Sequence, residues 1–314
     1  MSIHAVPVEK YHGTGNDFLV VDASEMIADR AAFAEAHCDR ETGANGEDFG
    51  ANGGANDDDR LGADGVLFLS IEDRYRPTRV VMTLVQPDGS TAAMCGNGAR
   101  VVARWAHDRT GETEFMIDTQ AGTRRATVTP DGSEATIEMG VPRFGPDDVS
   151  VDADEPLVET PVEGLTVTAV NTGVPHAVAF VEDVDDVDLE TVAPAVRNAP
   201  IFPEGANVNL ATVIEDGFGN TPEGDSETDE AADAPPVIAQ RTFERGVEGE
   251  TRSCGTGAVA VAAVARRLGL VGGETIRTRP PGGELVIEVP QGESATLSGP
   301  VTHEFSGELP ADPR

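Results

Sequence analysis

Lysine is almost absent from this sequence of 314 residues: Lys10 is the only one, and arginine supplies the remaining positive charge. Lysine and arginine number 22 against 56 aspartates and glutamates, which gives a formal net charge of -34 at pH 7. Phosphate binding needs a basic surface, so this composition argues against nucleic acid as a partner. It predicts instead an acidic surface adapted to a high-salt cytoplasm, the alternative being an ordinary acidic protein with disordered inserts.

Cysteines and long apolar runs are also scarce. The three cysteines, Cys38, Cys95 and Cys254, form no Cys-x-x-Cys pair and no Cys/His spacing typical of zinc sites, which argues against a disulfide framework and a metal site. The longest apolar run, 258–265, is far shorter than the roughly 20 residues of a membrane-spanning helix. No basic segment precedes an apolar one at the start, so we predict no secretory signal, no membrane partner and a cytoplasmic location.

One cysteine motif occurs twice. The sequence CGNGAR (95–100) recurs as CGTGAV (254–259), and each copy opens a stretch that is compatible with a helix. Upstream of them, Thr14-Gly15 recurs as Thr172-Gly173 at nearly the same offset, and β-rich stretches follow both helices. Self-similarity that occurs only twice predicts a pseudo-twofold pair of domains rather than a solenoid. Because ligand clefts are common between domains, we expect the two motif cysteines to face each other across a site.

The expected fold is α/β (α+β), with two pseudo-symmetric domains at 1–145 and 146–314. The run 258–265 is apolar on every face, which predicts a helix enclosed by a mixed sheet or small barrel, and we expect the same of the helix at 99–109. A helix is also expected at 31–37, buried strands at 18–21 and 61–69, and a hairpin joining 210–214 to 237–239. Segments 41–59 and 215–234 read as acidic inserts and 142–161 as a linker, and the last residues are expected to pack back on the first domain.

Each motif cysteine immediately precedes a predicted helix. Free N–H groups and the positive end of the helix dipole favour a thiolate there, and the same N–H groups can bind a carboxylate. A carbon held between two such sulfurs could lose a proton to one thiolate and receive a proton from the opposite thiol. This chemistry inverts an α-carbon without a cofactor, and the N–H groups stabilise the charge that develops.

Three segments resemble the signatures of the diaminopimelate epimerase family: HGTGNDF (12–18), MCGNGAR (94–100) and FERGVEGETRSCGTGA (243–258). The resemblance covers nearly the whole chain apart from the two inserts. It implies a cofactor-independent isomerase that interconverts LL- and meso-2,6-diaminopimelate in lysine biosynthesis, with two α/β domains that close over a small amino acid. The sequence is also compatible with a homodimer.

The resemblance further implies roles for individual residues. Cys95 and Cys254 correspond to the acid/base pair, and His176 and Glu244 to residues that tune the thiols. The residues that correspond to substrate contacts are Asn16, Gln86, Gly96, Asn97, Asn207, Glu244, Arg245, Gly255 and Thr256.

Two positions depart from the family pattern, because Gln86 stands where many members have asparagine and Val174 precedes Pro175-His176 in place of a polar residue. Outside the motifs, Cys38 reads as a small buried hydrophobe. Arg100 and Arg104, at helical spacing, read as surface or helix-capping charges.

Three other functions remain open on the sequence. A proline-racemase-like enzyme of the same fold also uses two thiols, although Asn97 and the Glu244-Arg245 pair resemble the epimerase instead. A thiol-redox protein would use Cys95 and Cys254 as a reversible disulfide, and an amino-acid-binding module would not exchange α-protons at all.

The net charge generates a first prediction. Thermal unfolding should be measured at KCl concentrations from about 0.1 M, where the screening length is about 10 Å, to about 3 M. The melting temperature should rise with salt, because screening weakens the repulsion among carboxylates. A melting temperature that does not depend on KCl would contradict the proposed adaptation to high salt.

Overall fold

The computed structural model describes residues 4–44, 61–214 and 234–313. The chain divides into two compact units: unit 1 comprises Met1–Ile137 and Ser298–Arg314, and unit 2 comprises Glu138–Leu297. The chain therefore passes from one unit to the other within strand β8 (Glu134–Gly140) and again within β17 (Ala295–Pro300). The predicted boundary after residue 145 stays a prediction.

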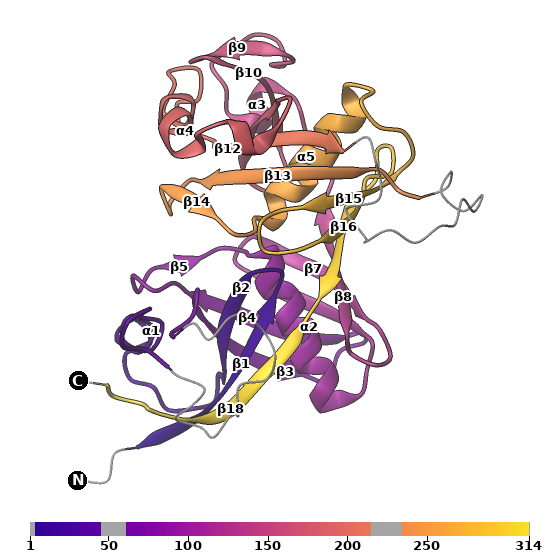
Figure 1. Cartoon of the computed structure of the whole chain (residues 1–314). Coiled ribbons are helices and arrows are strands. Elements are labelled where there is room, and N and C mark those ends of the chain that lie inside the picture. Colours follow the sequence, from indigo (N-terminus) through magenta and orange to yellow (C-terminus); the bar gives the residue numbers. More distant parts are fainter. Residues whose placement is uncertain (1–3, 45–60, 215–233, 314) are drawn as a thin grey trace, which may run out of the picture. The chain divides into compact units, whose positions relative to one another are not determined.

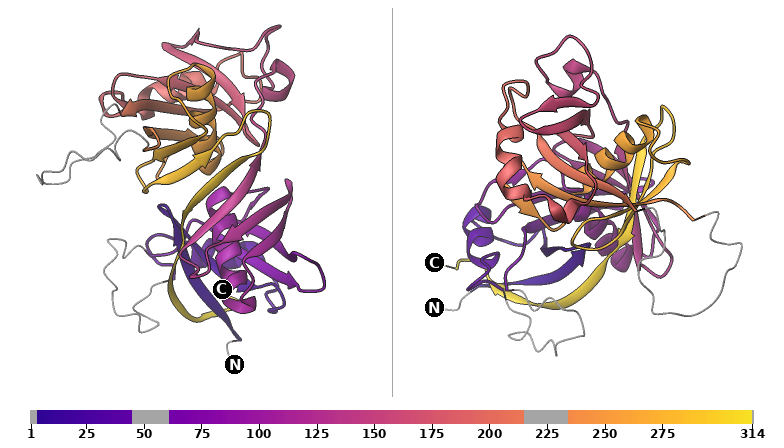
Figure 2. Two further views of the ribbon diagram at one scale, coloured as in Figure 1. Left: turned by 90° about the vertical axis from the view of Figure 1, so that its right-hand side faces the viewer. Right: turned by 45° about the horizontal axis from the view of Figure 1, so that its top comes forward.

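The described residues of unit 1 form a mixed sheet with the helices α1 and α2 (Figure 1). Its remaining elements are β1 (Ala5–Gly13), β2 (Asn16–Asp22), α1 (Arg30–His37), β3 (Val66–Glu72), β4 (Thr78–Val85), β5 (Thr91–Ala92), α2 (Gly96–Thr110), β6 (Glu114–Thr119), β7 (Gly122–Val128) and β18 (Thr302–Pro310). Strand β18 pairs antiparallel with β1, and Ala5 lies opposite Pro310, so the two ends of the described chain run side by side (Figures 1 and 2).

Unit 2 repeats this arrangement. Its elements are α3 (Pro146–Val149), β9 (Thr160–Val162), β10 (Leu165–Asn171), β11 (Pro175–Phe180), the 3₁₀ helix η2 (Val184–Asp186), α4 (Leu189–Arg197), β12 (Asn207–Ile214), β13 (Val237–Glu244), β14 (Gly249–Thr251), α5 (Gly255–Arg267), β15 (Thr275–Arg279) and β16 (Leu285–Glu288).

The pairing pattern demonstrates the internal duplication. Along β1–β2–β3–β4–β6–β7 the pairs alternate antiparallel, parallel, antiparallel, parallel and antiparallel. The series β10–β11–β12–β13–β15–β16 alternates in the same order. Parallel neighbours need a crossover, and the crossovers carry helices at equivalent places, α1 and α2 in unit 1, α4 and α5 in unit 2. The α/β fold with two pseudo-symmetric halves, predicted from the repeated motif, is confirmed.

Each unit encloses one helix. Helix α5 contacts β10–β13, β15 and β16, and all its residues from Gly257 to Ala265 are buried. Helix α2 contacts β1–β4, β6 and β7 in the same way (Figure 1). The prediction of an enclosed apolar helix is therefore correct for α5. Helix α2 is also enclosed, but one of its buried residues, Arg100, is charged.

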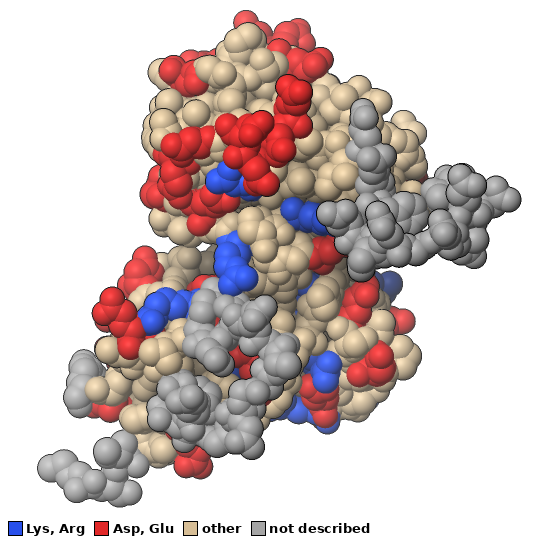
Figure 3. Space-filling model, in the orientation of Figure 1, with Lys and Arg blue, Asp and Glu red and all other residues tan. Residues whose placement is uncertain are grey.

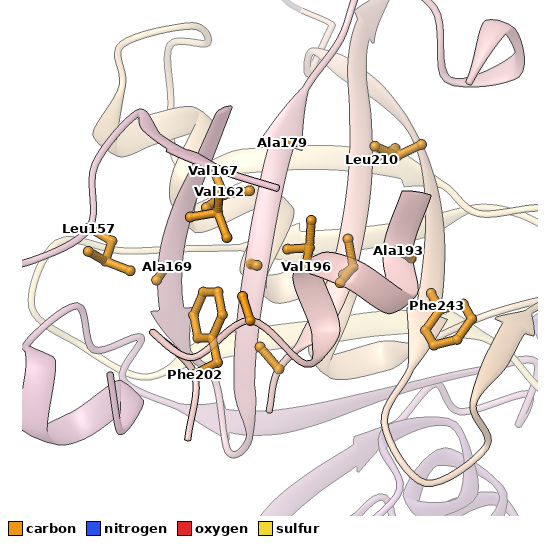
Figure 4. Packing of buried hydrophobic residues seen from close by; sticks show 14 of the residues in the cluster. Leu157, Val162, Val167, Ala169, Ala179, Ala193, Val196, Phe202, Leu210 and Phe243 are labelled. Atoms are coloured by element: carbon orange, nitrogen blue, oxygen red, sulfur yellow. The ribbon is translucent and has the colours of Figure 1, made fainter. Parts of the chain in front are cut away.

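A second helix, α1 in unit 1 and α4 in unit 2, packs on the opposite face of each sheet. In unit 2, Ala193 and Val196 of α4 pack with Phe202 against strand residues such as Val167 and Leu210 (Figure 4). In unit 1, Phe33 of α1 packs against apolar residues of β1, β2 and β3. Cys38 belongs to this second cluster and is 1% exposed, which confirms the prediction of a buried thiol.

Several local predictions can now be compared with the structure. The helix at 31–37 is α1, and the hairpin joining 210–214 to 237–239 is the antiparallel pair β12–β13. The strand expected at 61–69 begins only at Val66. The linker predicted at 142–161 is wrong, because Val149 and Leu157 belong to the buried core of unit 2. Most of the two acidic inserts, 45–59 and 215–233, lies outside the described residues.

Acidic side chains gather on the surface. On the face shown in Figure 3, Asp and Glu side chains cover much of unit 2 around α4 and β14, with few Lys or Arg side chains among them. None of the helices within 4–44, 61–214 and 234–313 combines the length and the apolar character that crossing a membrane requires.

The core of unit 2 generates a stability prediction. Leu210 is 0% exposed in the cluster under α4, so Leu210→Ala should lower the free energy of unfolding by about 2–5 kcal/mol, measured by chemical denaturation. Leu270→Ala is the matched control, since that side chain is 45% exposed and its removal should cost less than about 0.5 kcal/mol. Equal costs at the two positions would contradict the assignment of the core.

Candidate functional site

The two motif cysteines occupy the same local geometry. Cys95 is the N-cap of α2, with φ -141° and ψ 120°, and Cys254 is the N-cap of α5, with φ -119° and ψ 108°. Each Sγ accepts a hydrogen bond from the backbone N–H three residues on, Gly98 for Cys95 and Gly257 for Cys254, and both distances are 3.4 Å. A sulfur at this position interacts with free N–H groups and the positive end of the helix dipole, which favour the thiolate. Both halves therefore place a cysteine sulfur at the same position relative to the N-terminus of an enclosed helix.

The glycine three residues after each cysteine leaves room for the sulfur that caps the helix. A Cβ on Gly257 would lie 2.6 Å from Asn209 Oδ1 and 3.2 Å from both Cys254 Cβ and Thr242 Oγ1. A Cβ on Gly98 would lie 3.4 Å from the Cys95 Cβ and from the end of the Met82 side chain, and 3.6 Å from Leu67 Cδ2. The first contact is closer than real Cβ atoms come, so Gly257 is sterically required where Gly98 is only favoured.

Two asparagines of unit 1 bind each other near Cys95. Asn97, 1% exposed in the first turn of α2, donates from Nδ2 to Asn16 Oδ1 at 2.6 Å. Asn16, at the start of β2, donates from its own Nδ2 to Asp64 Oδ2 at 2.9 Å. The structure thus brings together Asn16, Asn97 and the N-terminal turn that begins at Gly96, as the sequence resemblance implied.

Arg100 corrects a prediction. Expected at the surface, it is 0% exposed and extends from the second turn of α2 into unit 1. Its Nη2 donates to Asn97 Oδ1 at 2.7 Å and to Thr14 Oγ1 at 3.0 Å, and its Nη1 donates to the Pro300 carbonyl oxygen at 2.9 Å. Arg104 lies closer to the surface and pairs with Asp108 at 2.8 Å, so the prediction fits Arg104 but not Arg100.

Asn16 is hydrogen bonded to a network of charged residues through Asp64. Asp17 is 2% exposed and forms ion pairs of 2.9 Å with Lys10 and 2.7 Å with Arg40, and Arg40 also binds Asp64. Burial alone would raise the pKa of Asp17, but the hydrogen bonds and charges of Arg40 and Lys10 outweigh it and hold that pKa below its usual range. The single lysine of the chain is therefore a buried partner of this network.

His176 is the centre of a polar cluster in unit 2. Its side chain is 0% exposed, and burial, followed by the charge of Arg245, lowers its pKa to about 3. Asn209 Nδ2 lies 3.0 Å from His176 Nδ1, and Asn209 Oδ1 accepts from Thr242 Oγ1 at 2.9 Å. The lowered pKa leaves the imidazole neutral near neutral pH, and amide nitrogens of Asn209 and Asn207 face its two ring nitrogens.

Asn207, Glu244 and Arg245 lie together at the ends of β12 and β13. Asn207 Oδ1 accepts from the Arg245 backbone N–H at 2.7 Å, and Asn207 Nδ2 lies 3.5 Å from His176 Nε2. Glu244 accepts from Thr251 Oγ1 at 2.5 Å, and Arg245 Nη1 donates to the Glu204 carbonyl oxygen at 3.1 Å. These contacts gather a carboxylate, an amide and a guanidinium, which can serve both ends of an amino acid.

The remaining predicted residues differ in their surroundings. Gly255 begins α5 beside Cys254, and Thr256 places its Oγ1 3.4 Å from Cys254 Sγ. Gln86 donates to Ser90 Oγ at 2.8 Å within its own turn, so its amide is not joined to the Asn16–Asn97 pair. Gln86 comes directly after β4, and Glu244 is the last residue of β13. The two positions are equivalent, because the residues before them, Val85 and Phe243, occupy matching places in the strand registers of the two units. Val174 precedes β11, and its carbonyl accepts from Thr172 N–H at 3.3 Å.

Sequence reasoning missed four residues at these clusters, Asp64, Arg100, Asn209 and Thr242. Asn209 had a usable signal: it lies two residues after Asn207 on a strand, so both side chains point to the same face. Asp64 had a weaker one, since it stands in a glycine-bounded turn before a buried strand. Nothing in the local sequence separates the buried Arg100 from the surface Arg104.

Two similar units, each with a cysteine that caps an enclosed helix, define a two-domain α/β fold of a known class. A solved structure of a predicted epimerase from Pseudomonas aeruginosa shares this fold, with a TM-score of 0.60 and 16% identity over 97% of this chain and 99% of that chain.

Sequence comparison gives the family. The diaminopimelate epimerase model matches residues 8–145 and 168–304. The diaminopimelate epimerase of Methanothrix thermoacetophila is 42% identical over 299 residues, 93% of this chain and 91% of the relative. That of Methanocella arvoryzae is 38% identical over 311 residues, 96% of each chain. The chain belongs to the diaminopimelate epimerase family.

The capping glycines generate a paired prediction. Gly257→Ala should lower the free energy of unfolding by about 1–3 kcal/mol, because the new Cβ overlaps Asn209 Oδ1, whose amide is hydrogen bonded at both ends. Gly98→Ala should change it by less than about 1 kcal/mol, since Met82 can move and alanine favours the helix. Chemical denaturation of both variants measures the difference. A costlier change at Gly98 would contradict the packing described here.

Proposed function

We propose that this protein is a diaminopimelate epimerase that interconverts LL- and meso-2,6-diaminopimelate, with Cys95 and Cys254 as its acid and base. Membership of the family and the matching N-cap geometry of the two thiols support this proposal. The reaction as proposed needs no cofactor and belongs to lysine biosynthesis in the cytoplasm.

The proposed chemistry is a transfer of two protons at one carbon. The thiolate of one cysteine removes the α-proton, and the electron pair moves into the adjacent carboxylate. The thiol of the other cysteine delivers its proton to the opposite face, which inverts the centre and leaves that sulfur as the thiolate. In the reverse direction the two sulfurs exchange roles. The proposal therefore requires both sulfurs to reach the same carbon.

The backbone around each cysteine supports this chemistry. The N–H groups at the start of α2 and α5, including those of Gly96 and Gly255, are free of partners within their own helices. As hydrogen-bond donors at the positive end of a helix dipole, they stabilise the negative charge that builds up on a substrate carboxylate as the α-proton leaves. Thr256, with Oγ1 near Cys254 Sγ, adds a hydroxyl to that end.

The polar clusters supply contacts for the rest of the substrate. Asn16 and Asn97 in unit 1, with Gln86 at the end of β4, are proposed contacts on that side. In unit 2, Asn207, Glu244 and Arg245 are proposed to bind the amino and carboxylate groups of the non-reacting centre. His176 is proposed to act as a neutral hydrogen-bonding group, because its pKa of about 3 leaves it uncharged near neutral pH.

A deuterium wash-in experiment tests the proposal. In heavy water the wild-type protein should convert each diaminopimelate isomer into the other, with solvent deuterium at the inverted α-carbon. Cys95→Ala and Cys254→Ala should each slow interconversion by at least about 10²-fold, since each removes one of the two proton-transfer groups. Mass spectrometry and separation of the isomers measure both quantities.

The matched control is Cys38→Ala, which removes the third thiol from the core of unit 1 and should leave interconversion unchanged. Near wild-type turnover by either motif-cysteine variant would contradict the two-base assignment. Turnover of proline isomers without turnover of diaminopimelate would favour a proline-racemase-like activity. Exchange of the cysteine pair with protein disulfides, without any α-proton exchange, would favour a thiol-redox function.

A further inference from the structure

The repeated Thr-Gly dipeptide occupies an equivalent turn in each unit. In unit 1, Thr14 and Gly15 connect the antiparallel strands β1 and β2. In unit 2, Thr172 and Gly173 lie between the antiparallel strands β10 and β11. Both threonines are 4% exposed, so both hydroxyls are enclosed, and an enclosed hydroxyl needs a hydrogen-bond partner. The partners show what each turn holds in place.

In unit 2 the threonine binds the first turn of the enclosed helix directly. Thr172 Oγ1 donates to the Thr256 carbonyl oxygen at 2.8 Å. Thr256 is the second residue of α5 and lies two residues after Cys254. Gly173 continues the strand turn with φ 112°, a conformation that glycine adopts readily, and a Cβ there would lie 3.9 Å from Thr256 Cγ2. The turn between β10 and β11 is therefore fastened to the start of α5.

In unit 1 the threonine reaches the equivalent residue through Arg100. Asn97 lies two residues after Cys95, as Thr256 does after the other motif cysteine. The buried Arg100 Nη2 donates to Thr14 Oγ1 at 3.0 Å and to Asn97 Oδ1 at 2.7 Å. One guanidinium nitrogen thus joins the turn between β1 and β2 to the first turn of α2. The same two parts of the fold are connected in both units, with a side-chain amide as the acceptor in unit 1 and a backbone carbonyl in unit 2.

Thr14 is held in a strained conformation. Its φ of 54° lies in the left-handed region, which is unfavourable for a β-branched side chain. Two-residue turns between antiparallel strands favour asparagine, aspartate or glycine where φ is positive. Strain of this kind persists where surrounding contacts impose it, and it is concentrated at functional sites. The turn leads directly into Asn16, whose Oδ1 accepts from Asn97 Nδ2 at 2.6 Å, so it also sets the position of that amide pair.

We propose that Thr14 and Thr172 are positioning residues, one in each unit, that lock the first turn of the cysteine-capped helix to the neighbouring strand turn. The catalytic meaning of this inference rests on the proposed function. The locked groups are the Asn97 amide in unit 1 and the N–H groups at the start of α5 in unit 2, which are proposed to bind substrate. The Thr-Gly dipeptide is then repeated because both halves need the same lock.

Valine and serine substitutions test the role of the hydroxyls. Valine keeps the shape of threonine without the hydroxyl, and serine keeps the hydroxyl. Thr172→Val should lower kcat for diaminopimelate interconversion about 10-fold or more with little change in KM, because the displaced N–H groups act on charge that develops in the transition state. Thr14→Val should lower kcat/KM by a similar factor of about 10, since it disturbs two proposed substrate contacts. The two serine variants should recover most of the lost turnover.

Hydrogen exchange measures the lock without any turnover. In Thr172→Val the backbone amides of residues 255–260 should exchange about 3-fold faster or more, because loss of one hydrogen bond makes local opening easier by roughly that factor. Thr172→Ser should keep the wild-type rates. Mass spectrometry of peptides separates the two helices, so the amides of residues 96–101 serve as an internal reference that Thr172→Val should leave unchanged.

Thr78→Val and Thr278→Val are matched controls, one in each unit. Both threonines are 0% exposed on strands, Thr78 on β4 and Thr278 on β15. Within the part of the chain that the structure describes, neither hydroxyl has a hydrogen-bond partner. Each control therefore loses a buried threonine hydroxyl that holds nothing in place, and turnover and exchange should stay at the wild-type level. Melting temperatures of all variants show that the kinetics are measured on folded protein.

Wild-type kinetics and exchange in the valine variants would overturn the positioning role. Serine variants or controls as impaired as the valine variants would overturn it too. Thr14→Gly and Thr172→Ala also remove the hydroxyls, the first without strain at positive φ, and they keep the test decisive if a valine variant does not fold.

The outcomes also separate the two proposals. Faster exchange at the start of α5 in Thr172→Val, with no interconversion of diaminopimelate by the wild-type protein, rejects the proposed function alone. Interconversion that is unaffected by the loss of either hydroxyl rejects the positioning role alone.

Discussion

The hydrogen bond from a backbone N–H to a cysteine sulfur at the start of a helix is the interaction on which this structure depends. It holds each sulfur at the positive end of a helix dipole and requires the residue that donates it to approach closely. At Gly257 the buried amide of Asn209 excludes any side chain larger than hydrogen, whereas at Gly98 the nearest neighbours leave room for a methyl group. The sheet that encloses each helix then fixes where the sulfur lies.

Duplication explains the fold, and divergence explains the chemistry. The strand registers place the pair Leu67 and Leu84 of unit 1 where unit 2 has Asn209 and Thr242. In unit 1, where this strand pair is apolar, the polar groups near the start of the helix come from the helix itself, from Asn97 and Arg100. In unit 2 the helix is apolar from Ala258 to Ala265, and the strands supply the polar groups instead. The polar side chains nearest the two equivalent cysteines therefore come from the helix in unit 1 and from the strands in unit 2.

Much of this arrangement could be predicted from the sequence. The repeated motif predicts two similar units, and the apolar run at 258–265 predicts an enclosed helix, because an α-helix without a polar face needs cover on all sides. What could not be predicted is which charged residues are buried. Arg100 and Arg104 lie one turn apart on α2, and only the path of residues near Pro300 decides that the first is covered. Contacts between segments 200 residues apart leave no mark on local periodicity.

Strand β18 has a further consequence, which concerns synthesis on the ribosome. The last strand of the chain pairs with the first, whereas unit 2 lies wholly between them in the sequence. Every residue of unit 2 has therefore been made before the sheet of unit 1 can be completed. During translation one edge of β1 therefore stays without its partner strand until β18 has left the exit tunnel. The order of maturation is thus the reverse of the order of synthesis: the half that begins first is finished last.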